Sequence, residues 1–154
     1  GFQVIDFKSP AEVLKEYGFN VDSVTDVIIT HAHHDHIEAI HYFKNATIHI
    51  QYDEYQIGKT YIPENFHVNC FEDVYTIDNC VKILKIGGHS IGSCIVVFEK
   101  GNQKYVITGD ECYIKECLDK KIPTGSSCCH SKSRAFVEQY GSGDYVPLLC
   151  HDIR

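Results

Sequence analysis

Short hydrophobic runs alternate with polar stretches along the chain, and none approaches the roughly 20 apolar residues that a membrane-spanning helix needs. Residues 26–30 carry three consecutive β-branched side chains, which is typical of a buried strand. Over residues 46–51, Ile48 and Ile50 alternate with polar residues such as His49, so we predict a half-buried strand with one polar face. Strand patterns also cover residues 2–7, 81–86, 94–99, 104–108 and 145–150.

Sequence patterns typical of helices lie between these predicted strands. Ser9-Pro10-Ala11-Glu12 combines a capping box with a proline in the first turn, so we predict a helix that runs to Tyr17 and ends at Gly18. Further helices are expected at residues 35–43, 53–57 and 131–140. Strands and helices alternate without an internal repeat, which indicates an α/β fold in a single domain spanning residues 1–154.

Composition and charge limit the classes of partner that we expect. The net charge is −7 and the Lys and Arg residues are scattered, which argues against nucleic acid and membranes as partners and favours a small-molecule substrate. The chain shows no N-terminal secretory signal, so we expect a cytoplasmic protein. The oligomeric state stays open, with a homodimer as one alternative. Because the chain begins at Gly1 and contains no Met, we hypothesise a preceding segment or methionines missing from the sequence.

The eight cysteines include no C-x-x-C pair, so we expect free, mostly buried thiols in a reducing cytosol. Cys128-Cys129-His130 has the composition of a metal clip, but adjacent residues of a strand point to opposite faces, so we favour no metal-binding role. Cys112 and Cys150 fall near candidate ligands, and for both we favour packing over thiol ligation.

The strongest chemical signal is the run Thr30-His31-Ala32-His33-His34-Asp35-His36, directly after a predicted strand. Where a strand passes into a helix, the alternating His31 and His33 point to one side, and Asp35 and His36 fall on the next. Imidazole nitrogens and carboxylate oxygens suit Zn²⁺, Fe²⁺ or Mn²⁺. Four ligands cannot complete two metal sites, so further His or Asp residues must come from elsewhere in the chain.

Three residues at predicted strand ends can supply these ligands. His89 lies in the glycine-rich loop Gly87-Gly88-His89-Ser90, Asp110 follows the strand at 104–108, and His151 follows the last predicted strand. Because loops at strand ends gather into one site, we expect all three near the histidine run.

The order H-x-H-x-D-H, Gly-His-Ser, Gly-Asp and a late His resembles the metal set of the metallo-β-lactamase superfamily, and the match extends from Val4 to His151. The resemblance implies an αββα sandwich, and the nearness of the motifs to both chain ends suggests that it is truncated at the N-terminal sheet and the C-terminal helix. It also implies that His31, His33 and His89 hold a first metal, that Asp35, His36 and His151 hold a second, and that Asp110 bridges the two.

By the same resemblance, the chain is expected to be a metal-dependent hydrolase with two divalent ions, zinc first, with iron or manganese as alternatives. A water shared by two such ions loses a proton near neutral pH, and the resulting hydroxide would attack a small ester, lactone or thioester carbonyl. Asp35 would then pass a proton to the leaving group.

Two other functional classes stay open. One is an iron-dependent oxidoreductase on the same fold, persulfide dioxygenase-like or flavodiiron-like, although diiron relatives typically carry Glu at the position of His33. The other is a non-catalytic binding domain with a decayed site, against which the retention of all seven candidate ligands weighs. The chain also departs from most relatives at Glu38-Ala39, where two glycines are usual, so the following helix is expected slightly further out.

The remaining histidines and one tyrosine receive simpler interpretations. His34 is expected to be a helix-start residue or to support the ligands indirectly. Tyr113, three residues beyond Asp110, is interpreted as a core aromatic, with contact to a substrate carbonyl as the alternative. The other histidines are expected to face solvent or to pack without binding metal: His41, His49, His67 and His130.

Overall fold

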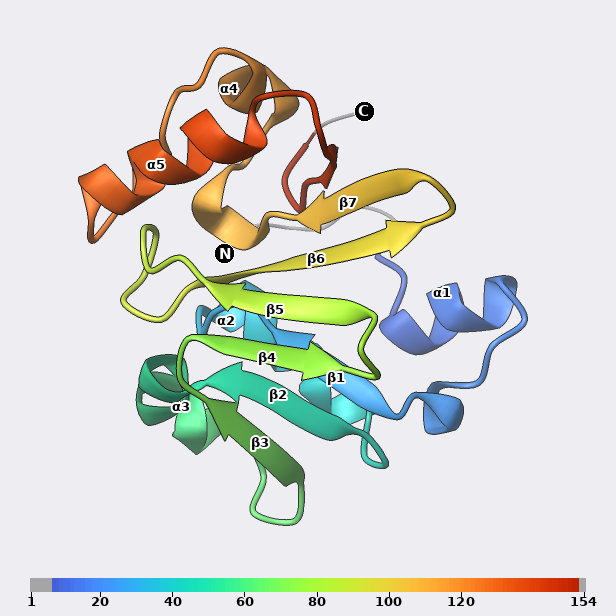
Figure 1. Cartoon of the computed structure of the whole chain (residues 1–154). Coiled ribbons are helices and arrows are strands. Elements are labelled where there is room, and N and C mark those ends of the chain that lie inside the picture. Colours follow the sequence, from blue (N-terminus) through green and yellow to red (C-terminus); the bar gives the residue numbers. More distant parts are fainter. Residues whose placement is uncertain (1–6, 153–154) are drawn as a thin grey trace.

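The computed structural model describes residues 7–152 and contains two sheets flanked by helices (Figure 1). The α-helices are α1 (Pro10–Glu16), α2 (His34–Ile37), α3 (Tyr52–Gly58), α4 (Lys115–Asp119) and α5 (His130–Tyr140). The strands are β1 (Asp26–Ile29), β2 (Thr47–Gln51), β3 (His67–Phe71), β4 (Val74–Ile77), β5 (Val81–Lys85), β6 (Cys94–Lys100), β7 (Gln103–Ile107) and β8 (Val146–Leu148). Short 3-10 helices are η1 (Val21–Ser23), η2 (Glu38–Tyr42), η3 (Lys59–Tyr61) and η4 (Gly109–Glu111).

The strands form one three-stranded and one five-stranded sheet. The first has the order β1-β2-β3 and is parallel throughout. The second has the order β4-β5-β6-β7-β8, antiparallel from β4 to β7 and parallel between β7 and β8. As a result, the ends of β5, β7 and β8 and the start of β6 lie along the same edge of the second sheet.

Three apolar clusters mark the interfaces between four layers. On the outer side of the first sheet, Ile37 of α2 and Ile40 of η2 pack with Ile48 of β2. Between the sheets, Phe71 of β3 packs with Ile83 of β5. Successive strand residues point to opposite faces, so both sheets can be buried on two sides.

The third cluster lies on the outer side of the second sheet. Leu118 of α4 and Phe136 of α5 pack there with Ile95 of β6 and Val106 of β7. Figure 1 shows α4 and α5 on the side of this sheet away from the first one. The order of layers is therefore helix, sheet, sheet, helix, which confirms the predicted αββα sandwich.

Several local predictions are confirmed. The Ser9 hydroxyl and the Glu12 carboxylate form the expected capping box of α1, and Gly18 follows that helix with a φ of +81°. β6 and β7 form the predicted hairpin, with Gly101 at a φ of +63° in its turn. Pro147 lies in β8, which pairs only with β7 among the described strands and is thus an edge strand.

Other predictions need correction or lie outside the described residues. β2 is not half-buried: its predicted polar face is buried because the second sheet covers it, and the His49 ring there bonds to Asp26 and Asn69. The predicted helix at 35–43 divides into α2 and η2, and β3 and α4 were not predicted. The predicted strand at 2–7 lies outside the described residues, apart from Phe7.

The expectation of mostly buried thiols is wrong, although all eight cysteines are free. Only Cys94 and Cys112 are buried, whereas Cys117 and Cys129 are partly exposed and the other four are exposed. No helix within residues 7–152 combines the length and apolar character that crossing a membrane requires.

Candidate metal centre

The histidine run forms the turn between β1 and α2. His31 is completely buried, and His33 has extended backbone angles and occupies the position just before the helix that begins at His34. Asp35 and His36 follow in the first helical turn, where a carboxylate is favoured by the helix dipole. The backbone N–H of Cys94, at the start of β6, donates to the carbonyl of Thr30 at 2.8 Å, so this turn is joined directly to the second sheet.

The three other candidate ligands come from the edge of the second sheet. His89 lies in the loop between β5 and β6, Asp110 lies in η4 just after β7, and His151 follows β8. Gly109 has a φ of +50°, and a Cβ there would lie 3.0 Å from the Thr30 Cβ. The glycine therefore allows Asp110 to approach the histidine turn closely.

The structure brings all seven residues together in two groups. His31, His33, His89 and Asp110 form the first, and Asp35, His36 and His151 form the second; within each, the potential ligand atoms lie within 4.8 Å of one another.

In the first group, His33 Nδ1 lies 3.0 Å from both His31 Nε2 and His89 Nε2. Asp110 Oδ2 lies 3.6 Å from His31 Nε2 and 3.5 Å from His89 Nε2. Ligands of a tetrahedral zinc, with bonds of about 2.0 to 2.1 Å, are separated by about 3.3 Å, so these distances fit a shared cation. A proton on His33 Nδ1 could form a hydrogen bond with only one of its two neighbours, His31 Nε2 or His89 Nε2. A cation between the three rings would instead be coordinated by all three nitrogens.

The second group meets the other oxygen of the same carboxylate. Asp110 Oδ1 lies 3.0 Å from His36 Nε2 and 3.1 Å from His151 Nε2. The two histidine nitrogens are 3.4 Å apart, and Asp35 Oδ2 lies 3.6 Å from His36 Nε2. Asp110 thus directs one oxygen to each group, which is the arrangement a bridging carboxylate requires.

Neighbouring groups fix which ring nitrogens face the centre. His89 Nδ1 lies 2.7 Å from the carbonyl of Ser126 and donates to it, which leaves Nε2 unprotonated in the neutral ring. The Thr30 hydroxyl lies 3.3 Å from His31 Nδ1 and 3.5 Å from His36 Nδ1. The outer nitrogens of these three rings therefore have partners, and their inner nitrogens are available as ligands.

The charges of the centre also suit metal binding. Burial, reinforced by the nearby His36, lowers the pKa of His31 to about 3, so this imidazole is neutral under ordinary conditions. Burial acts to raise the pKa of Asp110, but the hydrogen bond and charge of His36 prevail and lower it to about 2. Burial likewise opposes the effect of Asp110 on His36, whose pKa is nevertheless raised. The centre thus combines an ionised carboxylate with a neutral buried imidazole.

A buried acid beside Asp110 was not recognised in the sequence. The Glu111 carboxylate accepts hydrogen bonds from the backbone N–H groups of Gly88 and His89, at 3.0 and 3.1 Å, and from the Ser93 hydroxyl. Burial raises its pKa despite these hydrogen bonds. Glu111 holds the His89 loop against η4, and its position next to Asp110 is the sequence signal that could have identified it.

Tyr113 borders the centre and is not part of an apolar cluster, so its interpretation as a core aromatic is wrong. It is half-buried, and its ring makes edge contacts with His89 and His151, with centroids 6.0 and 5.3 Å apart. The side chain therefore contacts one member of each group.

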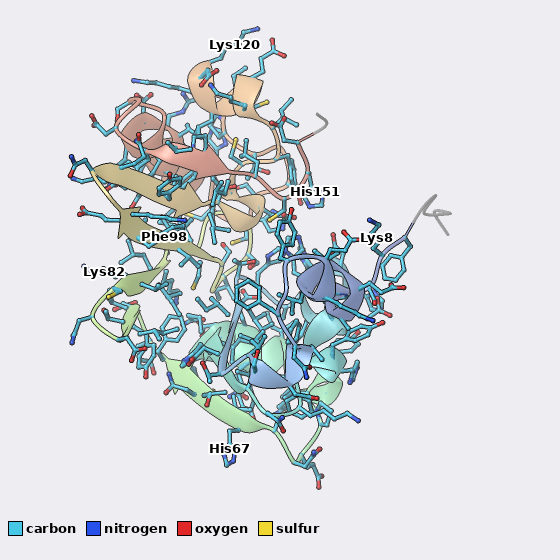
Figure 2. The ribbon with its side chains drawn as sticks, turned by 90° about the vertical axis from the view of Figure 1, so that its right-hand side faces the viewer. Lys8, His67, Lys82, Phe98, Lys120 and His151 are labelled. Carbon is cyan, nitrogen blue, oxygen red and sulfur yellow. The ribbon has the colours of Figure 1, made fainter. Side chains whose placement is uncertain are left out.

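The remaining candidates lie apart from the two groups. His34 is exposed and pairs with Glu38, and Cys112 packs in the cluster under α5. Neither Cys128 nor Cys129 belongs to a metal-type group among the described residues. The other histidines are exposed or, like His49, hydrogen-bonded elsewhere; Figure 2 shows His67 and His151 in different parts of the molecule.

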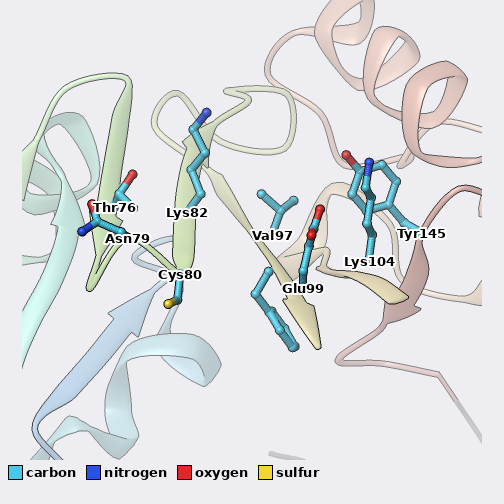
Figure 3. A pocket seen from close by; sticks show the side chains of 9 residues that line it. Thr76, Asn79, Cys80, Lys82, Val97, Glu99, Lys104 and Tyr145 are labelled. Carbon is cyan, nitrogen blue, oxygen red and sulfur yellow. The ribbon is translucent and has the colours of Figure 1, made fainter. Parts of the chain in front are cut away.

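Two hollows differ in their relation to the centre. One of about 270 Å³ is lined by side chains such as Lys82, Val97 and Glu99 from β5 and β6 (Figure 3), and none of the seven candidate ligands lines it. The other, of about 600 Å³, includes Asp35 in its wall and lies between the start of α1 and η2. Only the second hollow adjoins a candidate ligand.

Comparisons with known proteins identify related sequences. The family model described as metallo-beta-lactamase superfamily matches residues 4–135. A probable metallo-hydrolase of Methanocaldococcus jannaschii is 33% identical over 111 residues, covering 71% of this chain and 48% of that protein. An N-acyl homoserine lactonase of Bacillus thuringiensis subsp. kurstaki is 27% identical over 119 residues, covering 72% and 48%. The chain thus spans about half the length of these curated relatives.

Solved structures share the fold. A probable metal-dependent hydrolase from Staphylococcus aureus superposes with a TM-score of 0.79 at 24% identity, covering 96% of this chain and 62% of that one. An N-acyl homoserine lactone hydrolase, with N-hexanoyl-L-homoserine bound at its catalytic metal centre, gives 0.77 at 23% identity, covering 93% and 62%. These structures show the shared fold. The family model matches residues 4–135, which is most of the chain, and shows that the chain belongs to the metallo-β-lactamase superfamily.

Proposed function

We propose that this chain forms a single domain that binds two divalent metal ions, most readily zinc, and hydrolyses a small ester, lactone or thioester. The observation that carries the proposal is the division of the seven candidate ligands into two groups that share the Asp110 carboxylate. Three histidines and a carboxylate in the first group form a donor set that zinc accepts readily.

Metal ions bound there would lower the pKa of a coordinated water and polarise the scissile carbonyl. The side chains of the centre have separate roles in this reaction. Asp110 supplies a negative charge to both groups, and buried His31 stays neutral as a ligand must. Asp35, whose side chain is 62% exposed, lies at the solvent side and is placed to hold a proton for the leaving group.

Tyr113 is proposed to orient the substrate. Its ring bridges His89 and His151, so its hydroxyl can donate to an oxygen of a substrate held at the centre. We expect Tyr113→Phe to lower kcat by about 100- to 1,000-fold, since one donor to a developing oxyanion is lost. The bound metal should not change, which elemental analysis would check. Unaltered kcat would exclude this role for the hydroxyl.

The hollow beside Asp35 favours a substrate with an apolar part. Its lining is mixed: Phe7, Pro10, Ala39 and Tyr42 give it an apolar part, and the other lining residues are Lys8, Asp35, Glu38 and His41. Such a wall suits a hydrocarbon group whose ester or lactone carbonyl reaches the metal centre. The relatives named as N-acyl homoserine lactonases make acylated lactones the first compounds to test.

The experiment combines metal analysis with a hydrolysis panel. Anaerobically purified chain should contain about two zinc ions, and it should open acylated lactones or cleave esters or thioesters with release of acid. Asp110→Asn should lose both metal and activity, whereas His67→Ala, at an exposed histidine of β3, should keep both. A chain with two zinc ions that hydrolyses none of these classes would refute the reaction. A single iron per chain would favour the oxidoreductase alternative.

A further inference from the structure

Glu54 is a buried acid that connects two of the ligand-bearing segments. It lies in the first turn of α3 and is 1% exposed. Its Oε2 accepts a hydrogen bond of 2.7 Å from the backbone N–H of Ala32, which stands between His31 and His33. Its Oε1 accepts from the Ser90 hydroxyl at 2.6 Å and from the Gly92 N–H at 2.8 Å, both in the loop that carries His89.

The packing around α3 indicates that this connection is close. A Cβ added to Gly58, at the other end of α3, would lie 2.8 Å from the Ala32 Cβ. A Cβ on Gly92 would lie 2.9 Å from the Glu54 Cγ. Both ligand-bearing segments thus rest against α3 without space for a methyl group, and neither can shift without breaking a hydrogen bond to Glu54.

We propose that Glu54 is a positioning residue for the metal centre, fixing the distance between the His31–His33 turn and the His89 loop. The inference rests on the proposed metal binding and adds a residue whose hydrogen bonds go to the ligand-bearing segments and not to the ligand side chains. One carboxylate oxygen holds each segment, so the three imidazoles of the first group are arranged before a metal arrives. Preorganisation of this kind reduces the ordering that binding would otherwise require.

The variant Glu54→Gln tests the proposal because an amide retains the shape but has a single acceptor oxygen. With that oxygen in the Oε1 position, the NH₂ group faces the Ala32 N–H. With the amide flipped, the NH₂ group faces the Gly92 N–H. In either orientation one hydrogen bond to a ligand-bearing segment is lost, because the amide NH₂ group and a backbone N–H, both donors, face each other.

The matched control is Asp53→Asn, one residue earlier on α3. Asp53 also loses a charge in this change, but its side-chain partners are Lys85 and Gln51 and not the ligand-bearing segments. Zinc affinity would be measured by competition with a chromogenic chelator, and ligand geometry by the visible spectrum of the Co²⁺-loaded chain. The Tm of the metal-free chain reports separately on folding.

We expect Glu54→Gln to weaken zinc binding by about 10- to 100-fold and to alter the Co²⁺ spectrum, measured well below its Tm. Asp53→Asn should match the wild type in both. A purely structural role would lower the metal-free Tm and leave the affinity and spectrum unchanged, and that result would overturn the proposal.

If Glu54→Gln does not fold, Ser90→Ala decides the question, since it removes only one of the three hydrogen bonds. It should weaken zinc binding by about three- to tenfold, and an unchanged affinity would refute the proposal. A wild-type chain that binds no zinc would overturn the proposed function and this inference together. Wild-type binding with unaltered variants would overturn only this inference.

Discussion

Zinc binding should raise the thermal stability of the chain by a calculable amount. The candidate ligands come from four separate segments, namely the turn after β1, the β5–β6 loop, η4 and the residues after β8. The unfolded chain cannot hold them together, so zinc binds mainly the folded state. When the free zinc concentration is about one hundred times the Kd, binding raises the free energy of unfolding by about 2.7 kcal/mol per ion.

For a chain of this length, each kcal/mol raises Tm by about 2 to 4 °C, so one ion should raise it by about 5 to 11 °C. The eight free thiols also bind zinc in the unfolded chain, which places the expected shift toward the lower end. The metal-free chain should still unfold cooperatively, because none of the three apolar clusters includes a candidate ligand.

The assay is a thermal melt followed by circular dichroism, with EDTA and then with excess zinc. His89→Ala leaves the first group with two imidazoles and one carboxylate, so most of the zinc-dependent rise should disappear. His67→Ala should retain the full rise, because His67 is exposed on β3. A wild-type Tm that does not respond to zinc, or an equal rise in His89→Ala, would refute the reasoning.

Two further changes test the surroundings of the centre. In Gly88→Ala the new Cβ would lie 2.9 Å from the backbone nitrogen of Ser133, so we expect a loss of about 1 to 3 kcal/mol in urea unfolding, whereas Gly125→Ala, with nothing within 4 Å, should be neutral. The hydrogen bond from His49 lowers the pKa of Asp26, so the stability it contributes is present above the unfolded pKa of 3.8 and is lost as pH falls through the folded value. Asp26→Asn should therefore be less stable than the wild type at about pH 6, with a deficit that shrinks between about pH 4 and pH 2; a constant deficit would contradict the assignment.

The sequence was enough to select the seven candidate ligands that the structure brings together, because their chemistry depends on residue type and order. The H-x-H-x-D-H run lies at the end of a strand whose apolar triplet is visible without any partner. His89, Asp110 and His151 were recognisable because each follows a predicted strand or its loop, and strand ends converge. Their assembly into two groups is what the structure adds.

Features that depend on a distant partner could not be predicted in the same way. The polar face of β2 is buried because another sheet covers it, and the alternation of His49 with isoleucines carries no information about that sheet. β3 was missed because His67 and Asn69 interrupt its apolar pattern. From the sequence alone, a glutamate on a short helix is expected to face solvent. Only the three hydrogen bonds that the Glu54 carboxylate accepts show that it connects other segments.

The two groups differ in exposure, which implies a division of roles. In the first group His31, His89 and Asp110 are buried and only His33 is exposed. No member of the second group is buried, and the side chains of Asp35 and His151 are 62% and 40% exposed. A ligand buried among fixed neighbours loses little freedom on binding a cation, but an exposed side chain must be ordered. We therefore expect the first group to fill first, and substrate to approach over the second. Because Asp110 contacts both, a change in either group is transmitted to the other through one carboxylate.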